Sequence, residues 1–236
     1  MNQAGITKYI LDLISKTQDF DLLDTWIDLL NSLMLYSNIH SQKEILKHLK
    51  NSDKHIKFFI YLKERLRSWY IKTTSFIDNP IYNLRSLQET KFEERKRMDC
   101  LNILDLIQSF WGNCFVEFQD YLQSQESRDE TQSFISIDLV SEVLFLLERI
   151  SKMKNDLFFD PISTNLAVKI LKTLMALISG PSFKNQLILG TWKRMYRILN
   201  FFINQDLQNY APITDEKKAK INLFWYSVNL ISLILR

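Results

Sequence analysis

The side chains that most often bind metal ions or catalyse reactions are few in this sequence, and their spacing keeps them apart. Three histidines, His40, His48 and His55, fall within sixteen residues. His48 and His55 would share a face only on one continuous helix, whereas Ser52 and Asp53 between them are typical of a helix start. We therefore expect surface histidines on neighbouring helices and no metal site.

Acidic side chains gather at two places without the pattern of a cation site or a catalytic pair. The run Glu126, Asp129 and Glu130 lacks the glycine-pinned spacing of an EF-hand loop, which favours a solvated loop. Asp99 and Asp105 fit the polar side of an amphipathic helix. The sequence predicts no catalytic residue.

The positions of the cysteines and glycines argue against a disulfide and against a nucleotide-binding loop. The two cysteines, Cys100 and Cys114, lie in an apolar helical pattern and are interpreted as reduced core thiols, which favours a reducing compartment. The glycines are too far apart for a phosphate-binding loop or a dinucleotide-binding turn; they stand at positions 5, 112, 180 and 190. We expect no cofactor and no enzymatic activity.

The charge is divided into blocks of alternating sign, although the net charge is only +3. Residues 43–97 carry 14 basic and 7 acidic side chains, and residues 161–236 carry 10 and 3. Residues 98–160 carry 4 basic and 12 acidic side chains. Solvated helix faces explain this pattern, and so does a basic block that meets an acidic partner.

The first basic block combines lysines at helical spacing with aromatic residues, a combination that suits phosphate contact and base stacking. Its lysines would line one face of a continuous helix, but the break expected at Ser52 divides them between two helices. Alternatively, the aromatic side chains Tyr61, Trp69 and Tyr70 belong to the core. The lysine row comprises Lys43, Lys47, Lys50, Lys54 and Lys57, and Lys63, Arg65, Arg67 and Lys72 continue the block. The last four lysines of the row are candidate partner contacts.

A second basic cluster lies within a helix predicted over residues 183–204. Lys193 and Arg197 are one helical turn apart there, so both can address one acidic group, and arginine supplies a bidentate fork. Lys184, Trp192 and Tyr196 accompany them. Lys193, Arg194 and Arg197 are candidate partner contacts.

The C-terminal stretch is apolar on every side of a predicted helix. It is interrupted by polar residues and shorter than the roughly 20 residues of a membrane span, so we expect a helix buried in the core or covered by a partner. The spacing aligns Trp225 with Ile221, Val228 and Ser232, and we predict that this side is core. Leu230, which points elsewhere, is the interface candidate. Leu233 and Ile234 are further candidate contacts.

Composition and periodicity predict an all-α protein. Only 4 glycines and 4 prolines occur, far below average usage, and apolar residues recur at helical spacing with no sustained alternation. We predict one domain over residues 1–236, with a charged loop or arm near 81–97 and a mobile polar loop near 124–133. About nine helices are expected, over 6–16, 22–36, 42–51, 53–76, about 90–123, 136–150, 161–179, 183–204 and 215–236.

The spacing of helix pairs, near 40 residues, resembles that of HEAT and armadillo repeats, so we expect a short α-solenoid; a globular helical bundle is the alternative. Such surfaces favour a non-enzymatic scaffold or adaptor that binds partner proteins as a subunit of a larger assembly. The alternative is a nucleic-acid-binding helical module using residues 43–72 and 184–197. The first residues show no secretory or transit pattern, so we expect an intracellular protein, cytoplasmic or nuclear.

Overall fold

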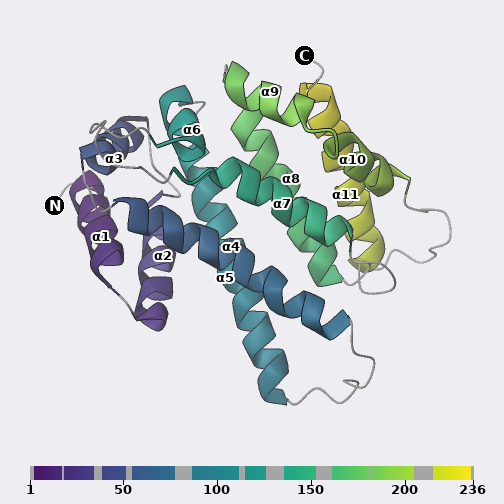
Figure 1. Cartoon of the computed structure of the whole chain (residues 1–236), viewed down its shortest axis with the longest axis horizontal. Coiled ribbons are helices and arrows are strands. Elements are labelled where there is room, and N and C mark those ends of the chain that lie inside the picture. Colours follow the sequence, from purple (N-terminus) through teal and green to yellow (C-terminus); the bar gives the residue numbers. More distant parts are fainter. Residues whose placement is uncertain are drawn as a thin grey trace. The chain divides into compact units, whose positions relative to one another are not determined.

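A computed structural model describes residues 3–17, 19–34, 39–51, 55–77, 87–111, 115–125, 136–152, 161–180, 182–204 and 215–234. Within these ranges the secondary structure is helical, with eleven α-helices and no strand, which confirms the all-α prediction. Figure 1 shows the arrangement of the helices. Among the described residues, no helix is long and apolar enough to cross a membrane.

The chain divides into two compact units, Met1–Glu142 and Val143–Arg236, with the boundary inside α7. The organisation as one domain over residues 1–236 therefore stays a prediction. The helices of the first unit are α1 (Gln3–Lys16), α2 (Phe20–Met34), α3 (Ile39–Asn51), α4 (His55–Ile77), α5 (Leu87–Trp111) and α6 (Val116–Gln123). They are followed by α7 (Leu139–Ser151), α8 (Pro161–Ile178), α9 (Phe183–Thr191), α10 (Met195–Ile203) and α11 (Asp215–Ile234).

Two helices that the sequence predicts as continuous are each divided in the structure. The helix predicted over about 90–123 is divided into α5 and α6, because Phe115 has a non-helical backbone with φ −80° and ψ 89°. The predicted helix over 183–204 is interrupted at Trp192, whose φ of −71° and ψ of 97° are extended. Glycine, a weak helix former, stands just before each break, at positions 112 and 190.

Several predicted helix starts differ from the structure. α3 begins at Ile39, three residues before the predicted start at residue 42. α5 begins at Leu87, so residues 87–97 are helical, while 81–86 lie outside the described residues. The side chain of Asp138 accepts a hydrogen bond from the Ser141 backbone N–H, which places the start of α7 at Leu139.

Other predicted features are confirmed. α8 begins at Pro161, where a missing N–H costs nothing, and α11 begins at Asp215.

Of the predicted loop over 124–133, only Ser124 and Gln125 are described. Gln125 is buried, and its amide group exchanges hydrogen bonds with the backbone of Ile137, at distances of 2.7 and 3.0 Å. The mobility of the rest of that loop lies outside the described residues.

The core of the first unit is built around α5, which packs against α2, α4 and α6. α1 and α2 run antiparallel side by side (Figure 1). Ring pairs with centroids 4.8 to 6.3 Å apart join α4, α5 and α6. They are formed by Phe58, Phe59, Phe110, Phe118 and Tyr121.

The second unit is built around the contact between α8 and α11, and α11 also packs against α10. Leu166, Ile170, Leu174 and Leu177 are buried along α8. In both units, helices distant in sequence pack together, such as α2 with α5 and α8 with α11. The stacking of consecutive pairs in a solenoid therefore stays a prediction.

Candidate functional site

The orientation of α11 is the reverse of the predicted one. Leu230 is 0% exposed and lies on the buried side with Leu223 and Ser227, whereas Trp225 is 53% exposed. Ser227 fits the core because its hydroxyl donates to the carbonyl of Leu223, at 2.7 Å. Leu230 is therefore a core residue and not the interface residue that the sequence predicted. The predicted core position of Trp225, Ile221, Val228 and Ser232 was wrong, since all four are exposed.

We define the α11 apolar face as Ile221, Phe224, Trp225 and Val228. Their exposed fractions are 44%, 37%, 53% and 42%, so a large part of every side chain meets solvent. Spacings of three and four residues place them on one side of the helix. Contiguous exposed apolar side chains mark interaction surfaces more often than isolated ones do.

Basic groups lie beside this face. The Trp225 and Tyr226 rings meet edge to face with centroids 4.7 Å apart, and Lys172 of α8 places its Nζ 4.9 Å from the Tyr226 centroid. Lys218 is exposed one turn before Ile221. Of the other predicted contacts on this helix, Leu233 and Ile234 are half-buried, and Ile234 packs against Gly190. The face thus combines apolar side chains with neighbouring cations.

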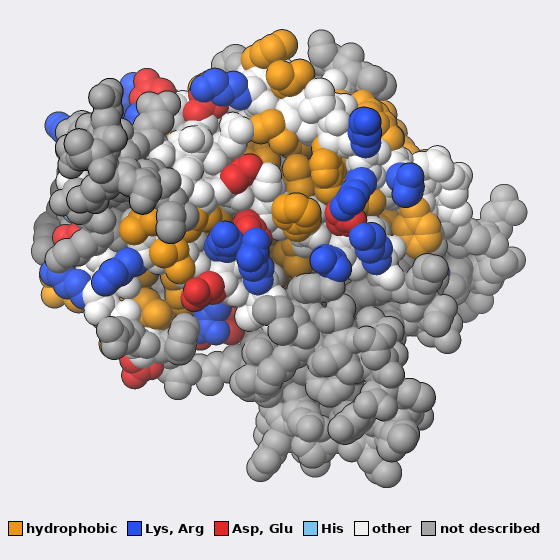
Figure 2. Space-filling view, viewed as in Figure 1, with side chains coloured by type: hydrophobic (Ala, Val, Ile, Leu, Met, Phe, Trp, Pro, Cys, Tyr) orange, Lys and Arg blue, Asp and Glu red, His pale blue; other side chains and the backbone are white. Residues whose placement is uncertain are grey.

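The second basic cluster also lies at the surface. Lys184, Lys193 and Arg197 are exposed. The predicted placement of Lys193 and Arg197 one turn apart on one helix was wrong, because Lys193 lies between α9 and α10 and only Arg197 lies in α10. Figure 2 shows Lys and Arg side chains gathered with hydrophobic ones where Figure 1 draws α10. Arg194 is occupied within the protein, because its guanidinium donates to both carboxylate oxygens of Glu148, at 2.7 and 2.6 Å.

Glu148 is a buried acidic residue of the second unit. Its side chain is only 5% exposed, and Lys152 approaches it to 2.5 Å beside Arg194. Burial by itself raises the pKa of this carboxyl group. The hydrogen bonds and charges of Lys152 and Arg194 outweigh burial and hold the pKa below its ordinary value.

The first basic block is divided as predicted, because α3 ends at Asn51 and α4 begins at His55. Lys43, Lys47 and Lys50 are exposed on α3, and Lys57 is exposed on α4. Lys54 lies outside the described residues. Nothing in the structure tests partner contacts of these lysines, which stay a prediction.

The arginines of this block serve the fold. Arg65 pairs with Asp24 at 2.6 Å and approaches Asp99 at 3.6 Å, while the buried Tyr61 hydroxyl donates to Asp24 at 2.6 Å. This network joins α4 to α2 and α5. Arg67 forms a bidentate pair with Glu142, at 2.7 and 2.6 Å. These internal pairs favour the interpretation of Tyr61 as core over its use in base stacking.

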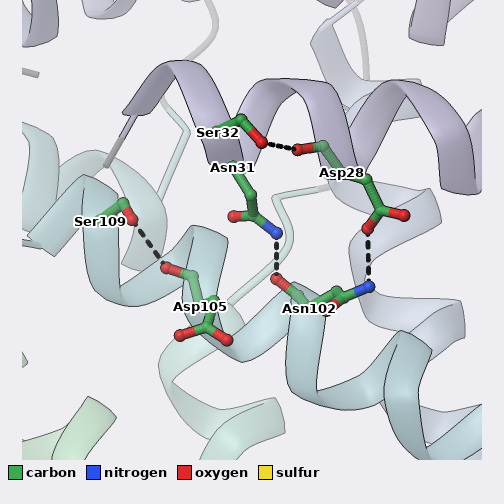
Figure 3. A pocket seen from close by; sticks show the side chains of 6 residues that line it. All are labelled: Asp28, Asn31, Ser32, Asn102, Asp105 and Ser109. Carbon is green, nitrogen blue, oxygen red and sulfur yellow. Dashed lines mark hydrogen bonds between the residues drawn. The ribbon is translucent and has the colours of Figure 1, made fainter. Parts of the chain in front are cut away.

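A polar pocket of about 420 Å³ lies between α2 and α5, and no sequence pattern predicted it. Asn102 donates to the carboxylate of Asp28 at 2.6 Å, and Asn31 donates to the carbonyl of Asn102 at 2.8 Å (Figure 3). Burial and the nearby Asp24 raise the pKa of Asp28. Ser32, Asp105 and Ser109 complete the lining. The hydrogen bonds hold α2 against α5, so we interpret the pocket as a structural contact.

The histidines do not form a metal site among the described residues. His48 lies 3.0 Å from the Asp12 carboxylate and thereby joins α3 to α1, and His40 is exposed. The side chain of His55 is not described. No group of three or more His, Cys, Asp or Glu side chains suited to a metal ion occurs in the described part of the chain.

The family described as RyR and IP3R Homology associated matches residues 93–203, from within α5 to the end of α10. This stretch is less than half of the 236 residues and does not include α11. No curated protein matches the sequence significantly. The family match indicates a helical domain of a kind that occurs within larger assemblies.

Proposed function

We propose that this chain is a non-enzymatic helical module that binds a partner protein through the α11 apolar face, as a subunit of a larger assembly. The observation that carries the proposal is the exposure of Ile221, Phe224, Trp225 and Val228 on one side of one helix. Tryptophan is among the residues that most often dominate a protein interface.

The gain from covering the face can be worked out for its largest side chain. Trp225 is 53% exposed, so a partner that covers it removes on the order of 100 Å² of apolar area from water. At about 25 cal/mol per Å², this corresponds to roughly 2.5 kcal/mol. The other three side chains add to this free energy. Burial of all four can therefore offset the entropy lost on association and stabilise a specific contact.

The remaining observations support binding over catalysis. The carboxylates of Asp24 and Asp28 accept hydrogen bonds from side chains of other helices. These polar groups therefore hold helices together. The family match supports a role within an assembly. The nucleic-acid-binding alternative stays a prediction, and the internal pairs of Arg65, Arg67 and Arg194 weaken it.

Affinity capture of the tagged full chain from its native cells tests the proposal. The variant carries Trp225→Asp and Val228→Asp, and the matched control carries Tyr9→Asp, a 61% exposed aromatic residue of the first unit. We expect a partner that the wild type and the control retain and the double variant loses. Circular dichroism must show equal helix content in all three proteins. Retention of the same partners by the double variant would contradict the proposal.

A further inference from the structure

We propose that the partner on the α11 apolar face is a second copy of this chain, whose α11 packs antiparallel against the first about a two-fold axis. This inference rests on the proposed function and names the partner. It follows from the order of the four apolar side chains along α11, the distribution of charge in the second unit and the area of the face.

The order of the four side chains is self-complementary. In an antiparallel pair of identical helices, a two-fold axis places each residue opposite a fixed residue of the other copy, and the reciprocal contact is identical. With the axis midway between Phe224 and Trp225, each of these rings lies opposite the other ring of the second copy. Ile221 then lies opposite Val228 of the other copy. Every side chain of the face therefore meets one of its own kind, ring against ring and β-branched against β-branched.

The spacing suits two packed helices. Ile221, Trp225 and Val228 follow one another at four and three residues, which spans about 10 Å or two helical turns. Rows at these spacings interdigitate when two helices cross at about 20° with their axes about 8–10 Å apart. Phe224 widens the face at its centre. In the antiparallel orientation the helix dipoles point in opposite directions, which favours it over a parallel pair.

The distribution of charge makes this stretch suited to contact with an identical surface. Val143–Arg236 carries 13 basic and 6 acidic residues, so contact between two copies elsewhere on the unit brings like charges together. Residues 221–235 carry no charged residue. In the antiparallel register Lys218 falls opposite the uncharged Ile231 of the other copy, whereas a parallel pair places it opposite its own counterpart. Two copies of α11 can therefore meet here without a like-charge contact.

The area of the face sets the strength of the contact. Large aromatic side chains have about 150–250 Å² of surface, so the four side chains, 37–53% exposed, offer on the order of 300 Å² per copy. Two copies together cover roughly 600 Å², to which the exposed Asn222 and Ser232 and the half-buried Tyr226 add. Stable complexes bury about 1,200–2,000 Å². The contact is smaller, so we expect a reversible dimer with a Kd on the order of 10 µM.

Other occupants suit the face less well. Nucleic acid would use the rings for stacking, but Ile221 and Val228 offer neither a stacking plane nor a hydrogen bond. A membrane surface would require the apolar side chains to insert about 5–10 Å, and those on this face are only about half exposed. A second α11 uses all four side chains.

Sedimentation velocity of the full chain over about 1–200 µM tests the inference. The wild type should change from monomer to dimer as its concentration rises, and higher salt should not weaken the dimer, because the contact is apolar. Trp225→Asp with Val228→Asp should weaken association by about tenfold or more and leave a monomer at each concentration. Tyr9→Asp serves as the control and should dimerise like the wild type. Circular dichroism checks that every variant retains its helix content.

Two single variants test the antiparallel register. Ile221→Lys alone and Val228→Glu alone should each dimerise weakly, because each introduces a charge opposite an apolar side chain. In a mixture of the two, the antiparallel register places the introduced ammonium opposite the introduced carboxylate. We expect the mixture to associate about tenfold more tightly than either variant alone. A parallel pair would place both charges opposite unchanged apolar side chains and would show no such recovery.

The outcomes separate the inference from the proposed function. A wild type that stays monomeric throughout overturns the second copy, and capture of a different protein that the Trp225 double variant loses leaves docking on the face intact. A dimer that the double variant retains, or a mixture that associates no better than the single variants, also overturns the inference. Binding to vesicles of phosphatidylcholine and phosphatidylserine through the same face, without dimer formation or protein capture, overturns both.

Discussion

Replacing Leu230 by alanine should destabilise the protein far more than replacing Trp225, although tryptophan is the larger residue. Leu230 is fully buried in the contact of α11 with the rest of its unit, so Leu230→Ala removes buried methyl groups and leaves a cavity. Such substitutions cost about 2–5 kcal/mol. Trp225 is 53% exposed, and its replacement loses mainly the edge contact with the Tyr226 ring. We expect about 1 kcal/mol for Trp225→Ala.

Urea denaturation of the two variants, followed by circular dichroism at 222 nm, measures the difference. Hydrogen exchange of a peptide from α11 reports on the same helix locally, so separate unfolding of the two units does not obscure the result. In thermal scans, a loss of about 3 kcal/mol corresponds to a lower Tm by roughly 6–12 °C. An equal or larger loss for Trp225→Ala would refute the orientation of α11 and the surface built on it.

Three further predictions concern internal contacts. Arg65→Met leaves the carboxylate of Asp24 without its cation and should cost about 1–3 kcal/mol in urea denaturation; an unchanged midpoint would contradict the network. The folded-state pKa of Glu148 is lowered, so its stabilisation is present above the ordinary value of 4.5 and is lost as pH falls through the folded-state value. Glu148→Gln should therefore be less stable than wild type at pH 7, with the gap closing below pH 4.5; a constant gap would oppose this. Burial, together with the nearby Asp99, raises the pKa of the Cys100 thiol to about 12, so in a Cys114→Ser protein iodoacetamide should label it only after unfolding, and rapid labelling of the native protein would disprove its burial.

The helical class could be predicted from the sequence because it depends on properties spread along the whole chain. Low glycine and proline content and apolar residues at helical spacing throughout predict helices and no sheet. Local signals also located the start of α8 at Pro161 and of α11 at Asp215. The breaks at Trp192 and Phe115 could not be predicted, since the apolar period continues through both and only weak helix formers precede them.

The orientation of α11 could not be predicted, because the helix is apolar on every side. The spacing of its apolar residues therefore does not show which side is buried. The alignment of Trp225 with Ile221 and Val228 predicted a core side there, but the buried side contains Ser227, whose hydroxyl is satisfied within the helix. The roles of the arginines depend on residues far away in the sequence. Arg65 meets Asp24 and Arg194 meets Glu148, 41 and 46 residues distant. A single sequence offers no signal for such pairs.

The basic side chains illustrate the same limit. A lysine on an exposed helix face and an arginine in an internal ion pair contribute the same charge to a basic block. Charge blocks alone therefore predict an acidic partner for both. The structure separates them: Lys47 and Lys50 are exposed, while Arg67 neutralises the buried carboxylate of Glu142. Charge alone therefore overestimates the surface available for a partner.

Site-specific photocrosslinking tests the central claim most directly. p-Benzoylphenylalanine is placed at Trp225, or at Tyr9 as an exposed aromatic control in the first unit, and the cells are irradiated. We predict a discrete protein adduct from position 225 and none of the same mass from position 9. The absence of an adduct at position 225, or the same adduct from both positions, would contradict a partner protein on the α11 apolar face.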